Sequence, residues 1–175
     1  MLEYSSRMLR GLVVLLLVVS VAGFLLSSAI HVATFFSINL GGIWRFSWFQ
    51  IGIFVVFIPT VAIYRYKEES FLPSVFPRWG QMPLYVLFGY FIFNMVFLML
   101  ALHGGSAELV NGAYQLTDHG RLIRYLTEQE YLRLTNYELR FFSSGWMIFY
   151  AGTAAYLWHL RDVVAPGFRE IHLEL

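Results

Sequence analysis

Three histidines are the residues of this sequence best suited to chemistry. His31 lies in the first long apolar segment, His103 ends a later one, and His119 follows in a polar stretch. Neutral imidazole is a common ligand of haem iron, copper and zinc. A His31–His103 pair could hold a b-type haem, and His119 would complete a metal site. His31 and His103 are expected at different depths in the membrane, however, and no second histidine lies one or two helical turns from either. We therefore expect packed or interfacial histidines, with haem or metal binding as the alternative.

Asn94 is the most polar residue in the middle of an apolar segment. An amide in such a place usually donates a hydrogen bond to another helix. Contact with a transported substrate is the other interpretation, which would make the chain a small transporter or channel. Ion-coupled transport normally needs ionisable groups inside the apolar segments, and the sequence places no Asp, Glu, Lys or Arg there.

Motifs of known catalytic chemistry are missing. The sequence has no G-x-S-x-G, no phosphate-binding Walker loop and no H-E-x-x-H. Ser143 and Ser144 have no plausible base close by in sequence. The chain also has no cysteine, which excludes disulfides, iron–sulfur ligation and covalent haem attachment. A protein without enzymatic activity is the expectation.

The composition predicts a membrane protein. Of 175 residues, 58% are hydrophobic and 13% are charged, whereas a soluble domain usually carries about 25% charged residues. A soluble fold of this length could not bury so much apolar surface, so lipid is the expected solvent. A net charge of +1 gives no reason to expect a nucleic-acid partner.

Four apolar segments approach the length that crosses a bilayer, about 20 residues. They predict transmembrane helices at about 12–36, 47–64, 83–102 and 144–160, which together form a single domain over 1–175. The predicted fold class is thus an all-α integral membrane protein, built as a four-transmembrane-helix bundle. All tryptophans lie at or near predicted helix ends, as expected of interfacial residues: they are Trp44, Trp48, Trp79, Trp146 and Trp158.

The segment 103–143 has its own pattern, typical of a small β meander followed by a helix. Asn111-Gly112 and the stretch 117–120 are turn signals between short apolar runs. Thr127 and Glu130 match a capping box, so a helix is expected to start there and to break or bend at Gly145. This insertion would lie outside the cytoplasm as a cap or docking surface. The predicted interaction residues are Asn94, Asn111, Gly112, Tyr114, His119, Tyr131 and Tyr137.

The distribution of basic residues predicts an orientation. Lys and Arg near segment ends favour the cytoplasm, and they place both termini there, in what is expected to be a bacterial inner membrane. With neither buried charge nor catalytic motifs, we expect an accessory or structural subunit of a larger membrane complex. Its partners would be membrane lipid and other membrane protein subunits, contacted through the helices and the outer loop.

Overall fold

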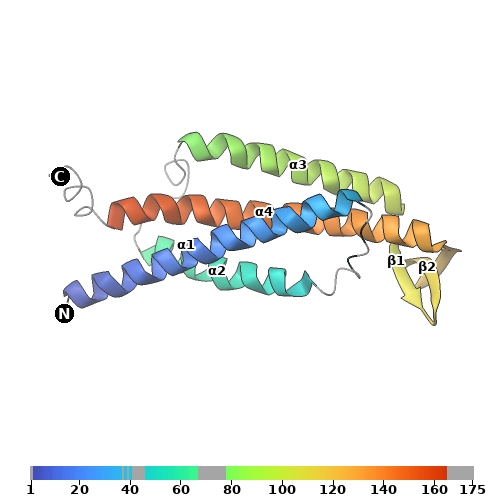
Figure 1. The fold of residues 1–175 in the computed structure, drawn as a ribbon, viewed down its shortest axis with the longest axis horizontal. Helices are drawn as coiled ribbons and strands as arrows, with labels where there is room; N and C mark the ends of the chain where they lie inside the picture. Colours follow the sequence, from blue (N-terminus) through green and yellow to red (C-terminus); the bar gives the residue numbers. More distant parts are fainter. Residues whose placement is uncertain (1, 37, 39, 41–45, 67–77, 165–175) are drawn as a thin grey trace.

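The computed structural model describes residues 2–36, 38, 40, 46–66 and 78–164. The N-terminal end of α1 and the C-terminal end of α4 lie at one end of an elongated molecule, and the β-sheet lies at the other (Figure 1). The elements, in chain order, are α1 (Leu2–Ala33), the 3-10 turn η1 (Thr34–Phe36), α2 (Ser47–Tyr66), α3 (Arg78–Leu102), β1 (Ser106–Val110), β2 (Ala113–Asp118), β3 (Arg121–Tyr125) and α4 (Glu128–Val164).

α4 is the central helix, and α1, α2 and α3 all pack against it. Its buried positions recur every seven residues in two series, Asn136, Ser143, Tyr150 and Leu157, and Leu139, Trp146, Thr153 and Leu160. α1 and the adjoining η1 bury a matching series, which consists of Val13, Ser20, Ser27 and Thr34. A repeat of 3.5 residues is the signature of supercoiled helix pairs. α1 and α4 form an antiparallel pair (Figure 1), in which the series from the first helix is small or polar and the series from α4 is mostly large and apolar.

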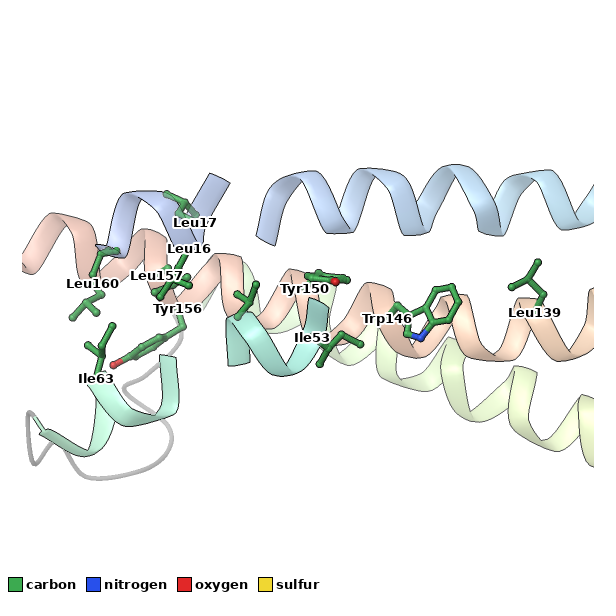
Figure 2. Packing of buried hydrophobic residues seen from close by; sticks show 12 residues of the cluster. Leu16, Leu17, Ile53, Ile63, Leu139, Trp146, Tyr150, Tyr156, Leu157 and Leu160 are labelled. Atoms are coloured by element: carbon green, nitrogen blue, oxygen red, sulfur yellow. The ribbon is translucent and has the colours of Figure 1, made fainter. Parts of the chain in front are cut away.

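Tyr150 makes the closest contacts with glycines in the helical core. A Cβ added at Gly23 of α1 would lie 2.5 Å from its ring, and one added at Gly52 of α2 would lie 2.4 Å from its hydroxyl. The hydroxyl also donates a hydrogen bond of 3.1 Å to the carbonyl of Phe49. Figure 2 shows Tyr150 between α1 and α2. The two glycines are thus what lets three helices close around one ring.

The cap, defined here as residues 106–139, forms as the turn signals predict. Its strands are antiparallel in the order β1-β2-β3. Asn111 and Gly112 have φ values of 51° and 80°, as a two-residue hairpin turn requires, and His119 and Gly120 repeat this at 49° and 79°. Its core joins the sheet to α3 and α4, with Leu102, Ala107, Leu116, Leu126 and Leu134 buried together.

The predicted capping box is confirmed at the start of α4. The Glu130 amide donates to Thr127 Oγ1 at 3.2 Å, and Glu130 Oε2 accepts from the Thr127 amide at 2.9 Å. The predicted break at Gly145 is wrong, because α4 runs unbroken for 37 residues. A Cβ at Gly145 would lie 3.2 Å from the Phe91 ring, so this glycine serves the close approach of α3 instead.

The predicted four-transmembrane-helix bundle is not supported. The described part of the chain has four α-helices and a three-stranded antiparallel sheet, so it is mostly helical with a sheet. Within the described residues, only Met8–Phe36 and Gly80–Leu102 are long and apolar enough to cross a membrane. The predicted segment 47–64 is a shorter apolar helix, Ser47–Ile63, which falls short of about 20 residues. The predicted segment 144–160 fails because serine, glycine, threonine and tyrosine interrupt its apolar residues.

The two long apolar helices expose most of their apolar surface. Only 33% of the apolar window in α1 and 6% of that in α3 is buried, whereas the core helix of a soluble protein would be mostly buried. Large side chains such as Leu15, Tyr85 and Phe93 are at least 60% exposed. Length, composition and this exposure agree with membrane association.

The tryptophan pattern agrees with the prediction in part. Trp48 and Trp158 are exposed, at 76% and 45%. Trp146 is packed inside the protein instead, because it is 3% exposed and stacks on Phe49 with ring centroids 5.1 Å apart. Trp44 and the side chain of Trp79 lie outside the described part of the chain.

Candidate functional site

The most concentrated polar cluster joins α1, α3 and α4 around His31. This histidine is 5% exposed. Its Nδ1 lies 2.9 Å from Ser143 Oγ of α4, a residue 112 positions away in sequence. Its Nε2 lies 2.7 Å from the Tyr90 hydroxyl of α3. We call these three residues the histidine junction, because one imidazole forms hydrogen bonds with side chains from two other helices.

The hydrogen bonds of the histidine junction engage both nitrogens of His31. Ser143 Oγ lies 2.9 Å from Nδ1 and 3.1 Å from the carbonyl of Arg140. Its single hydrogen serves one of these two acceptors, and the tautomer of His31 decides which.

Thr34 and Arg140 close the cluster at the end of α1. Thr34 Oγ1 donates to the carbonyl of His31 at 2.7 Å. Arg140 donates from Nε to Thr34 Oγ1 and from a terminal nitrogen to the Thr34 carbonyl, both at 3.1 Å. Cations and donors stabilise the C-terminal end of a helix, where carbonyls lack intrahelical partners. Arg140 therefore ties the end of α1 to α4.

The geometry of the histidine junction does not suit a catalytic serine. A nucleophilic serine gives its proton to the histidine and must reach a substrate, whereas Ser143 Oγ is also within hydrogen-bond distance of the Arg140 carbonyl. Ser143 is 0% exposed, and a tyrosine rather than a carboxylate contacts the other imidazole nitrogen. What this arrangement can do is hold three helices in one register.

The histidines predicted as haem or metal ligands lie apart. His31 contacts Tyr90, and His103 comes 13 residues after Tyr90 at the end of α3, roughly 20 Å along a helix. His103 and His119 are both exposed in turns, and His119 pairs with its neighbour Asp118. Among the described residues, no group of three or more His, Cys, Asp or Glu could hold a metal ion. The structure thus adds no contact in favour of a haem or metal at these positions.

The predicted interaction residues fall in two places. Asn94 is 4% exposed, but its amide donates to the Tyr90 carbonyl of its own helix at 2.9 Å. The cap tyrosines pack inward: Tyr114 stacks on Tyr131 at 4.7 Å, and Tyr137 meets Phe97 edge-on at 4.9 Å. These tyrosines hold the cap to α3 and α4 and offer little surface to a partner.

A second junction, between α4 and β1, carries a half-buried carboxylate. Glu138 accepts a hydrogen bond of 3.4 Å from the Ala107 amide. Burial raises the pKa of Glu138, the Ala107 amide opposes that shift, and Glu108 nearby raises the pKa further. Glu138 therefore satisfies the backbone N–H group of Ala107, which lies on the free edge of β1.

The sequence analysis did not connect four residues of this site to His31: Tyr90, Ser143, Arg140 and Thr34. A usable signal existed, since Ser20, Ser27 and Thr34 repeat every seven residues, as do Ser143 and Tyr150. Such a repeat of small and polar residues marks a packed seam when the remaining helix surface is apolar.

No family model, no curated protein and no solved structure matches the chain.

Proposed function

We propose that this chain is a non-enzymatic accessory subunit of a larger membrane assembly, which docks a partner through the β3 edge of its cap. One observation carries the proposal. All five residues of β3 are exposed, and Leu122, Ile123 and Tyr125 are large apolar side chains exposed by 46%, 48% and 64%. An exposed apolar edge strand is a ready template for pairing with another chain.

The two edges of the sheet differ in a way that favours β3. β1 starts close to the end of α3, and Glu138 of α4 accepts from its Ala107 amide. β3 pairs with β2 along one side, and no strand in the described part of the chain pairs with its other side. The β3 edge is therefore the one suited to receive a strand from a partner.

β3 is also held firmly, which lowers the entropic cost of docking. Arg124 of β3 forms an ion pair of 2.9 Å with Glu130 in the first turn of α4. The Leu126 amide that follows β3 donates to the carbonyl of Tyr114 at 2.9 Å. Since α4 continues from the cap into the helical core, the edge keeps a fixed position relative to the apolar helices.

The closed histidine junction supports a role without catalysis. Its imidazole nitrogens and its serine hydroxyl are all engaged by protein groups, and none is presented to a substrate. We further propose that the termini face the cytoplasm of a bacterial inner membrane. Arg10 and Arg161 lie at that end of α1 and α4, and basic residues favour the cytoplasmic side.

Co-purification from native membranes in a mild detergent tests the proposal. We expect the chain to run with a stoichiometric partner. Leu122→Asp combined with Tyr125→Asp should release that partner, because two buried charges would disrupt the docked edge. Leu109→Asp is the matched control, since Leu109 is 56% exposed on β1, and this variant should keep the partner.

Two results would contradict docking through β3. Wild-type protein that runs alone in mild detergent would remove the accessory role. Equal partner loss in the β3 and β1 variants would show that any charge on the cap interferes. Equal thermal unfolding midpoints for both variants would establish that the cap itself stays folded.

A further inference from the structure

Arg140 is a half-buried cation whose hydrogen-bond partners are all neutral. Nε and one terminal nitrogen donate to the side chain and carbonyl of Thr34. The guanidinium carbon lies 3.8 Å from the centre of the Phe35 ring and 5.5 Å from that of Tyr137. The ion pairs formed among the described residues do not include Arg140. Its charge is therefore stabilised by aromatic faces and a helix end, without a carboxylate.

The guanidinium keeps donors for a further ligand. It has five N–H groups in a planar fork. Two of its nitrogens reach Thr34, and the other terminal nitrogen makes no hydrogen bond to any described residue. Stacking on Phe35 orients the plane of the fork. An oriented fork with free donors is the arrangement with which arginine binds phosphate.

Arg140 lies at the level where the apolar segment of α1 ends, whereas the apolar segment of α3 continues beyond it to Leu102. The apolar segment of α1 closes at Phe36, and Phe35 and Phe36 are 55% and 71% exposed. On α4, no charged residue follows Arg140 until Arg161. When α1 crosses a bilayer, this level coincides with the headgroups, where lipid phosphates are found.

An aromatic stripe leads from Arg140 along the exposed side of α3. Tyr137 meets Phe97 at 4.9 Å, Phe97 stacks with Phe93 at 6.3 Å, and Phe93 stacks with Tyr90 at 6.4 Å. Phe93 is 62% exposed and Phe97 37%. The stripe gives an acyl chain a flat apolar surface that begins beside the guanidinium.

We propose that Arg140 binds the phosphate of an anionic phospholipid, whose acyl chain lies along Phe97 and Phe93. The phosphate supplies a negative charge beside the guanidinium. It also accepts hydrogen bonds from the N–H groups of Arg140 that do not bind Thr34. A protein carboxylate could also neutralise the cation, but it would not use the aromatic stripe. A phospholipid satisfies both features with one molecule. This binding site is separate from the β3 edge and does not depend on the docking proposal.

Native mass spectrometry of the full chain, released from nanodiscs of mixed phosphatidylglycerol and phosphatidylcholine, tests the proposal. Wild-type protein should retain phosphatidylglycerol preferentially. Arg140→Gln should lower that retention about tenfold, which corresponds to the loss of a charge-assisted hydrogen bond. Arg133→Gln is the control of equal charge, because Arg133 is an exposed arginine two turns earlier on α4, and it should retain the lipid.

Thr34→Val separates lipid binding from the tie between α1 and α4. It removes the hydroxyl that Arg140 contacts but keeps the guanidinium, so it should loosen α1 and still retain phosphatidylglycerol. Loss of lipid in Thr34→Val and Arg140→Gln alike would show that the helix end alone matters, and would overturn the proposal. Equal retention in the Gln variants of Arg140 and Arg133 would overturn it too.

Excess inorganic phosphate distinguishes a lipid from a free anion. The proposed site needs the acyl chain, so phosphate should leave the bound phosphatidylglycerol in place. Phe93→Ala should then weaken retention without changing charge. Full displacement of the lipid by inorganic phosphate, with no effect of Phe93→Ala, would mean that Arg140 binds a free anion and would overturn the lipid assignment.

Discussion

The helical core and the cap are held together by different kinds of contact, although α4 runs through both. In the helical core, the decisive contacts join residues far apart in sequence, such as His31 with Ser143 and Gly23 with Tyr150. In the cap, the decisive features are local: two-residue turns, a capping box and short antiparallel strands. The core thus depends on close approach, and the cap on local backbone geometry.

This difference predicts different sensitivities to substitution. A helix seam built on glycine and serine leaves no space for added atoms, since backbones are already in contact. A three-stranded sheet is marginal alone and depends on the helix that covers it. Added volume should therefore damage the helical core most, whereas the cap should respond to its turns and to the charges at its contact with α4.

The largest effect is expected from a single methyl group in the helical core. Gly52→Ala places a Cβ 2.4 Å from the Tyr150 hydroxyl, which forces α2 away from α4. We expect destabilisation of about 3 kcal/mol, the upper range for overpacking, measured as the free energy of unfolding in detergent. Gly89→Ala is the control, because a Cβ there meets nothing within 4 Å.

The same contact offers a rescue experiment. Tyr150→Phe removes the hydroxyl that the new methyl group would strike, at the cost of its hydrogen bond to Phe49. Gly52→Ala should therefore be less damaging in the Tyr150→Phe background than in the wild type, a coupling that a double-mutant cycle measures. Additive effects would show that the glycine matters for reasons other than space for this ring.

The sequence predicted the cap but not most contacts of the helical core, because the geometry of the cap is encoded locally and that of the core is not. Asn111-Gly112 and the Thr127–Glu130 pair encode their geometry within a few residues, so the strands and the start of α4 could be predicted. The His31–Ser143 contact is not local, and the seven-residue repeats mark both helices as packed without pairing these two residues. Small residues four apart, such as Gly23 and Ser27, indicate that the first and fourth apolar segments pack against helices, but they do not show that these two segments pack against each other.

Membrane spans were overcounted because charge-free length was taken as sufficient. The segments in α1 and α3 meet the criterion of length and hydropathy. The predicted segment in α4 is free of Asp, Glu, Lys and Arg, yet it carries buried polar residues, including Ser144 and Thr153. A helix that faces other helices on several sides can hold such residues, and its mean hydropathy falls accordingly.

A somewhat smaller effect is expected when the histidine junction is opened. His31→Ala leaves the Tyr90 hydroxyl and the Ser143 oxygen without their shared partner, and it creates a cavity beside α4. A loss of about 2 kcal/mol in unfolding free energy is the order expected for such groups. Hydrogen exchange should rise in α1 and α3 near the junction while the strands of the cap stay protected.

The control for the histidine junction is the exposed histidine at the end of α3. His103→Asn keeps a side chain that tolerates the φ of 49° found there, and it should leave stability unchanged. Equal losses in the two variants would mean that removing any histidine is harmful. Increased exchange in the cap strands with His31→Ala would show that the cap and the helical core unfold as one unit, against the distinction drawn here.

The smallest effect is expected at Glu138, where the cap meets α4. Burial raises the pKa of this carboxyl above its ordinary value of 4.5, so the folded state disfavours its charged form. The penalty is absent below about pH 4.5 and grows as the pH rises through the raised pKa, so this group lowers stability at neutral pH. Glu138→Gln keeps an oxygen for the Ala107 amide without the charge.

We therefore expect Glu138→Gln to raise the thermal unfolding midpoint at neutral pH and to leave it unchanged at pH values below the ordinary carboxyl pKa. Glu108→Gln should act in the same direction and more weakly, because Glu108 contributes only a secondary repulsion to Glu138. A lower midpoint for Glu138→Gln at neutral pH would show that the carboxylate charge strengthens its bond to the β1 edge. The cap would then depend on a charged contact with α4 as well as on its local turns. It would resemble the helical core in relying on a contact between residues far apart in sequence.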